Sequence, residues 1–142
     1  MPAGACGYNP AMGRILVVED DPSSQIVIRK ILTKLGGHMV TLTEDVAEVL
    51  ALVRARSVDA VVMDVSLTNS RHDGHWVDGV AITRLLKADP ATCAVPVLLA
   101  TAYALRGDAE RLLAACGADD YVSKPFVEPR ELVDKVERLL SR

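Results

Sequence analysis

Cysteine is scarce in this chain, and long apolar runs are absent from its sequence. The three cysteines, Cys6, Cys93 and Cys116, are odd in number and widely spaced, without a C-x-x-C pair. This spacing argues against a disulfide framework or a zinc site and is typical of reduced thiols in the cytosol. No apolar run approaches the roughly 20 residues that span a bilayer, and the N-terminus lacks the pattern of a secretory signal. We therefore expect a cytoplasmic protein without a membrane partner.

A block of Lys and Arg is also missing. The chain carries 16 Lys and Arg against 19 Asp and Glu, which gives a formal net charge of −3. Nucleic acid and anionic membrane surfaces need a positive footprint on their partner, so we expect this domain to bind neither. With 142 residues, 50% of them hydrophobic and 25% charged, the composition is that of one ordinary globular domain.

The first thirteen residues differ in composition from the rest of the chain. Residues 1–13 contain three Gly, two Pro and no charge, which predicts a flexible tail, or an expression remnant, before a domain over residues 14–142. From Arg14 onward, short β-branched segments alternate with segments of helical spacing. The expected strands are Ile15–Val18, His38–Leu42, Val58–Met63, Val95–Ala100 and Asp120–Val122.

Proline and glycine mark the boundaries of the helices expected between and after these strands. Pro22 and Pro129 stand where helices can begin, and Gly36, Gly37 and Gly117 stand where helices are expected to end. Five strands alternating with five helices predict an α/β fold with a parallel sheet covered on both faces. Ligands bind such open sheets beyond the carboxyl ends of the strands. Functional residues are therefore expected directly after each strand.

Candidate functional side chains follow the first, third, fourth and fifth expected strands. They are Glu19, Asp20 and Asp21 after the first strand, Asp64 after the third, Thr101 after the fourth and Lys124 after the fifth. Two carboxylates 4 Å apart repel by about 4 kcal/mol at an effective dielectric near 20. Clustered acids therefore require either a protonated carboxylate or a bound cation. An all-oxygen set without nearby His or Cys favours a hard ion such as Mg²⁺.

A phosphate group fits the same edge of the sheet. Magnesium often shares its coordination positions with a phosphate, and Thr101 and Lys124 offer a hydroxyl and an ammonium as donors. A carboxylate can itself accept a phosphoryl group and become an aspartyl phosphate. Asp64 is the best candidate, because it is central and lies opposite the acidic pair.

Four motifs together carry a resemblance to a known family. They are Val17-Val-Glu-Asp-Asp21, Val62-Met-Asp-Val-Ser-Leu67, Ala100-Thr-Ala102 and Asp120-Tyr-Val-Ser-Lys-Pro-Phe126. In this order and on these elements, they closely resemble the receiver domains of two-component response regulators, over about residues 14–142. The resemblance implies a flavodoxin-like single domain whose five parallel strands are ordered 2-1-3-4-5. It also implies a phosphoacceptor that takes part in its own phosphorylation and dephosphorylation, and not a turnover enzyme.

The resemblance assigns roles residue by residue. It implies that Mg²⁺ or Mn²⁺ is held by Glu19, Asp20, Asp64 and the backbone carbonyl of Ser66. Asp64 accepts the phosphoryl group from a histidine kinase or a histidine phosphotransfer protein. Thr101 and Lys124 then bind the phosphoryl oxygens, and a downstream protein effector responds to the change.

Further roles follow from the same resemblance. Tyr121 matches the aromatic residue that swings inward with Thr101, although half-buried packing is an equally good interpretation of it. Ser66 and Tyr103 match positions that set the rate of hydrolysis, and the ring of Tyr103 is expected to shield the phosphoryl group. The Lys124–Pro125 bond is expected to be cis. Asp21 is expected to cap the next helix, with Ser23 as a second candidate.

The chain departs from the family pattern after Asp64. The Asp-Gly pair that opens the third helix in the family recurs here at Asp78 and Gly79, fourteen residues past Asp64, so Thr68–Val77 is interpreted as an insertion. Long surface loops cost little, and neutral drift is one explanation. The other is a partner contact through Trp76, the only tryptophan. The two histidines of the insertion lack further ligands and are interpreted as solvated.

Two rival functions remain at this stage. The first is an interaction module that keeps the fold without phosphorylation, which the altered loop allows but the complete set of pocket residues disfavours. The second is a phosphohydrolase, which needs a general acid or base where the sequence offers no obvious candidate beyond Lys124. The sequence also leaves open whether the domain stands alone or belongs to a longer protein.

Overall fold

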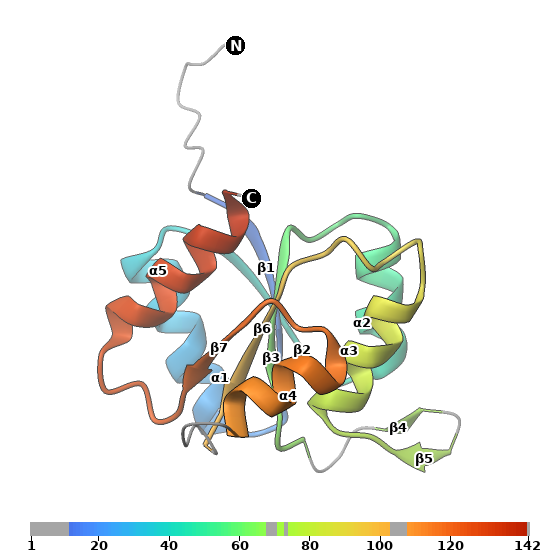
Figure 1. Cartoon of the computed structure of the whole chain (residues 1–142). Helices are drawn as coiled ribbons and strands as arrows, with labels where there is room; N and C mark the ends of the chain where they lie inside the picture. The colour runs from blue at the N-terminus through green and yellow to red at the C-terminus, as the bar shows by residue number, and fades with distance from the viewer. Residues whose placement is uncertain (1–11, 68–70, 73, 103–107, 142) are drawn as a thin grey trace.

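A five-stranded parallel sheet forms the centre of the protein (Figure 1). The computed structural model describes residues 12–67, 71–72, 74–102 and 108–141. The sheet has the order β2-β1-β3-β6-β7, which is the expected order 2-1-3-4-5. Its strands are β1 (Arg14–Val18), β2 (Met39–Thr43), β3 (Ala60–Asp64), β6 (Val97–Thr101) and β7 (Asp120–Ser123).

Three of the strands, β2, β3 and β6, begin and end one or two residues later than predicted, whereas β1 begins one residue earlier and β7 ends one residue later. Asp64 and Thr101 are therefore the last residues of β3 and β6 and not the first residues after them. At the start of β6, Pro96 has no N–H group for a ladder, but its carbonyl accepts a hydrogen bond from the N–H of Val61 at 2.9 Å. All residues of β3 and β6 are buried, as expected for central strands of a parallel sheet.

Helices cover both faces of the sheet (Figure 1). On one face lie α1 (Pro22–Lys30), the π-helical turn η1 (Ile31–Leu35) that continues it, and α5 (Pro129–Leu140). On the other face lie α2 (Val46–Arg54), α3 (Gly79–Ala88) and α4 (Asp108–Cys116). Successive residues of a strand point to opposite faces. Ile15 and Val17 thus enter the first core, and Leu16 and Val18 enter the second. No helix among the described residues is long and apolar enough to cross a membrane.

The predicted helix boundaries are confirmed where capping residues were named. The side chain of Asp21 accepts a hydrogen bond from the N–H of Ser24 at 2.9 Å, so Asp21 and not Ser23 caps α1. Gly117 ends α4 at a φ of 81°, a backbone conformation in which residues with a Cβ are strained.

The insertion after β3 contains a small β-hairpin that the sequence did not predict. Strands β4 (Arg71–His72) and β5 (His75–Trp76) pair antiparallel around Gly74, whose φ is 81°. Helix α3 follows at once, capped by Asp78, whose side chain accepts a hydrogen bond from the N–H of Ala81. The hairpin projects from the end of the molecule at which the sheet strands terminate (Figure 1).

Candidate functional site

Three carboxylates converge at the carboxyl edge of the sheet. One oxygen each of Glu19, Asp20 and Asp64 lies within 4.8 Å of the others. The convergence arises because β1 and β3 are paired neighbours, so the residues that end them meet. Glu19 is only 1% exposed and Asp64 4%. The predicted meeting of the acids is confirmed, and it places their charge in a largely dry environment.

Lys124 connects two of these carboxylates. Its ammonium Nζ lies 3.1 Å from Oε1 of Glu19 and 3.1 Å from Oδ1 of Asp64. The backbone N–H of Lys124 donates to the carbonyl of Thr101 at 2.9 Å, which joins the end of β7 to the end of β6. The Lys124–Pro125 peptide bond is cis, as expected. Segments separated by more than a hundred residues in the chain thus form one polar cluster.

The loop between β1 and α1 fixes the orientation of Glu19. Oε2 of its carboxylate accepts hydrogen bonds from the N–H groups of Asp20 at 3.1 Å and Asp21 at 3.3 Å. The backbone carbonyl of Glu19 accepts a 2.6 Å hydrogen bond from the side-chain amide of Gln25. Sequence analysis missed Gln25. The available signal was a polar side chain in the first turn of the helix that follows the acidic motif.

Burial and crowding change the protonation of the cluster. Burial, and after it the adjacent Asp64 carboxylate, raise the pKa of Glu19 to about 7, and Lys124 only partly opposes this. Burial alone would lower the pKa of Lys124. The hydrogen bonds and charges of Asp64 and Glu19 outweigh that effect, and the pKa of Lys124 is raised. One ammonium therefore compensates three carboxylates incompletely, and an all-oxygen set of this kind fits a small divalent cation.

Gly79, just after the insertion, packs directly against the backbone of Asp64 and Val65. Its N–H donates to the carbonyl of Val65 at 3.2 Å. A Cβ at this position would collide with the backbone carbonyl of Asp64, so only glycine fits here. The N–H of Ser66 donates to Oδ1 of Asp64 at 3.2 Å, which fixes that carboxylate from the side of β3. The chain on both sides of the insertion thus contacts the backbone or the carboxylate of Asp64 or its neighbour Val65.

Comparison with known proteins agrees with this geometry. Residues 15–137 match the family described as the response regulator receiver domain. The chain belongs to this family. It is 31% identical over 116 residues to the polar-differentiation response regulators DivK of Brucella anthropi and Brucella ovis, which covers 82% of this chain and 87% of theirs.

Solved receiver structures share the fold of this domain. The receiver domain of a sensor histidine kinase from Pseudomonas aeruginosa matches with a TM-score of 0.75 and 34% identity, over 92% of this chain and 99% of that one. That structure has a magnesium ion coordinated in its active-site cleft. A response regulator from Chloroflexus aurantiacus, itself described as putative, matches with a TM-score of 0.77 and 29% identity, over the same shares. The present receiver domain thus functions in two-component phosphorelay signalling.

The other predicted site residues of this receiver differ in how far the structure describes them. Thr101 is fully buried at the end of β6, one residue past Ala100, which pairs with Asp64. Tyr121 is half-buried in β7 and Ser66 is exposed. Tyr103 lies outside the described residues. Trp76 is placed in β5 by its backbone, and its side chain lies outside the description.

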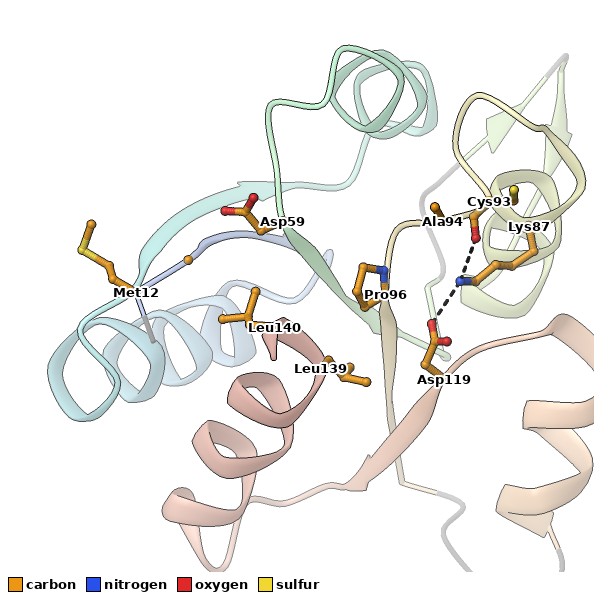
Figure 2. A pocket seen from close by; sticks show the side chains of 10 residues that line it. Met12, Asp59, Lys87, Cys93, Ala94, Pro96, Asp119, Leu139 and Leu140 are labelled. Carbon is orange, nitrogen blue, oxygen red and sulfur yellow. Dashed lines mark hydrogen bonds and ion pairs between the residues drawn. The ribbon is translucent and has the colours of Figure 1, made fainter. Parts of the chain in front are cut away.

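A cavity of about 610 Å³ lies at the opposite edge of this receiver, where the strands begin. Figure 2 shows the side chain of Lys87 pointing across it to Asp119. The ammonium of Lys87 already contacts the carbonyls of Cys93 and Val95 at 3.2 and 2.7 Å and Oδ2 of Asp119 at 3.0 Å. This arrangement ties α3 to the loops before β6 and β7 and is structural.

Proposed function

We propose that this receiver domain accepts a phosphoryl group on Asp64 from a histidine kinase or a histidine phosphotransfer protein. The observation that carries the proposal is the cluster itself. Three buried or half-buried carboxylates lie within 4.8 Å of one another, and Lys124 contacts two of them. The divalent ion is Mg²⁺ or Mn²⁺, held by Glu19, Asp20, Asp64 and the carbonyl of Ser66.

The transfer needs one nucleophile and a means to hold charge. A carboxylate oxygen of Asp64 attacks phosphorus while the phosphorus–nitrogen bond of the donor imidazole breaks, and the electron pair of that bond remains on the imidazole nitrogen, which then takes up a proton. Bound Mg²⁺ supplies neutralisation of the phosphoryl charge. Lys124, whose ammonium already lies 3.1 Å from Oδ1 of Asp64, moves its contacts to the phosphoryl oxygens. The hydroxyl of Thr101 donates a hydrogen bond to them.

The chemistry acts as a switch and not as a turnover reaction. Phosphorylation adds a charge of about −1.5 to −2, and Thr101 and Tyr121 pass the change to the surface formed by α4, β7 and α5. A downstream protein effector binds one of the two states of that surface. Ser66 and Tyr103 set the lifetime of the phosphoryl group. We place the protein in the cytoplasm, where its partners are proteins and not nucleic acid.

Substitution of the acceptor provides the test. Incubated with acetyl phosphate and Mg²⁺, the wild-type chain gains one phosphoryl group by intact-mass spectrometry, and Asp64→Asn gains none. Asp134→Asn, at an exposed position on α5, is the matched control and retains full uptake. Undiminished phosphorylation of Asp64→Asn contradicts the assignment of the acceptor. Absence of any uptake or beryllofluoride binding by the wild type favours the rival, a constitutive interaction module.

A further inference from the structure

Lys135 of α5 reaches over the edge strand β7 and contacts Tyr121 twice. Its ammonium donates a 2.6 Å hydrogen bond to the carbonyl of Tyr121. The same nitrogen lies 4.8 Å from the centroid of the Tyr121 ring, within the range of a cation–π interaction. It also lies 3.7 Å from Oδ1 of Asp120. A single cation therefore binds both the backbone and the ring of this residue.

The backbone of Tyr121 needs these partners because β7 is an edge strand. The N–H of Tyr121 donates to Oδ1 of Asp120 at 2.8 Å, and its carbonyl accepts the hydrogen bond from Lys135 on the open side of this edge strand. Asp120 and Lys135 thus satisfy the backbone N–H and the backbone carbonyl of Tyr121 at the sheet edge. These backbone contacts persist whatever the position of the ring, because they do not involve the side chain.

The ring of Tyr121 shares a face of the sheet with Thr101. Tyr121 pairs with Leu99, and Thr101 pairs with Ser123, two residues further along both strands. Since side chains alternate with a period of two, Tyr121, Leu99 and Thr101 point to the same side, toward α3 and α4. When Thr101 turns toward a phosphoryl group on Asp64, the space that it leaves opens beside this ring.

We propose that Lys135 is a positioning residue that retains the Tyr121 ring in its present place and so opposes the phosphorylated state. This inference rests on the proposed function. The cation–π contact exists only while the ring lies beneath the ammonium, so it stabilises one of the two states and lowers the affinity for any ligand that favours the other. An interaction of this kind corresponds to an effect of about two- to fivefold on the equilibrium.

Beryllofluoride, in the presence of Mg²⁺, is the probe of the phosphorylated state. Its half-saturating concentration is measured by amide chemical shifts in the full chain. Lys135→Met keeps most of the aliphatic stem and removes the charge, and we expect it to tighten binding about two- to fivefold. Lys135→Arg keeps a cation at this position and should retain the half-saturating concentration of the wild type. Arg138→Met removes an exposed charge from the next turn of α5 and leaves the value unchanged.

A double-mutant cycle separates the ring contact from the support of the strand edge. In a Tyr121→Leu background, Lys135→Met no longer changes the half-saturating concentration if Lys135 acts through the ring. An equal shift in both backgrounds, or no shift in the wild-type background, overturns the inference. Urea denaturation of each variant confirms that it is folded, and Lys135→Gln replaces Lys135→Met if the latter is not. Failure of the wild type itself to bind beryllofluoride contradicts the proposed function instead.

Discussion

We predict that binding of Mg²⁺ to this domain releases a proton from Glu19. In the metal-free domain, the pKa of Glu19 is raised to about 7 by burial and by Asp64, so near neutral pH this carboxyl is about half protonated. A metal ion requires the carboxylate form. Lowering the solution from about pH 8 to about pH 6 reduces the carboxylate fraction roughly tenfold, and the apparent Mg²⁺ affinity falls by the same factor, about 1.4 kcal/mol.

Isothermal titration calorimetry measures this linkage directly. Titrations in two buffers of different ionisation enthalpy give the number of protons released, which we expect to be about one half near pH 7 and close to one near pH 6. In Glu19→Gln, affinity is weaker because a charged carboxylate ligand is replaced by a neutral amide, but the dependence of affinity on pH over this range is largely removed. An affinity that is constant between pH 6 and pH 8, without proton release, refutes the reasoning.

The same shift has a defined sign for stability. The folded-state pKa of Glu19 lies above its ordinary value of 4.5, so between these values the folded domain binds more protons than the unfolded chain. Its contribution to the free energy of unfolding is therefore fully present below about pH 4.5 and is lost as pH rises through about 7, by up to about 3 kcal/mol. Mg²⁺ restores stability at the alkaline end, where the carboxylates repel most.

Three further predictions concern the residues around the acids. Gly79→Ala forces a methyl group against the Asp64 carbonyl, and chemical denaturation should show a loss of at least about 2 kcal/mol. Lys124→Met removes the cation that competes with Mg²⁺ for Glu19 and Asp64, so calorimetry should show tighter Mg²⁺ binding while beryllofluoride binding weakens at least about tenfold. Weaker binding of both Mg²⁺ and beryllofluoride would contradict the expectation that Lys124→Met affects the two ligands in opposite directions. Gln25→Met keeps the length of the side chain but loses the hydrogen bond to the backbone carbonyl of Glu19, so Mg²⁺ affinity should fall about threefold. Gln25→Asn is the control with a shorter amide. An unchanged Mg²⁺ affinity in Gln25→Met would show that Gln25 contributes to packing alone.

The sheet and the position of the acids were predictable because they follow from local patterns. Uninterrupted apolar segments such as those of β3 and β6 identify central strands, and the carboxyl ends of parallel strands meet at one edge. The residues that follow the strands therefore had to converge. The direct contact of Lys124 with Asp64 and the cap formed by Asp21 follow the same logic, since both residues lie at an element boundary.

Other features depend on distances that no local pattern contains. The hairpin has two strands of two residues each, too short for any period to be recognised, and the Asp73-Gly74 pair between them was the one local signal of a turn. The contact between Lys135 and Tyr121 joins two elements through side chains, and it depends on how α5 crosses the edge strand. The raised pKa of Glu19 depends on the burial of its side chain, and that burial follows from the packing of the folded domain and not from any local sequence pattern.

The hairpin adds surface to this receiver domain beside the acidic cluster, while the backbone on either side of Asp64 keeps its contacts with the sheet. Hydrogen bonds fix the chain on both sides of the inserted segment. The N–H of Val65 donates to the carbonyl of Ala100 at 3.1 Å, and the N–H of Gly79 donates to the carbonyl of Val65 at 3.2 Å. Extending a loop between fixed ends costs only a little more closure entropy as its length grows. The requirement for glycine beside the Asp64 carbonyl therefore lies at the start of α3, whatever the length of the loop before it. The Asp-Gly pair stands after the insertion because this backbone contact, and not the loop length, determines the geometry around Asp64.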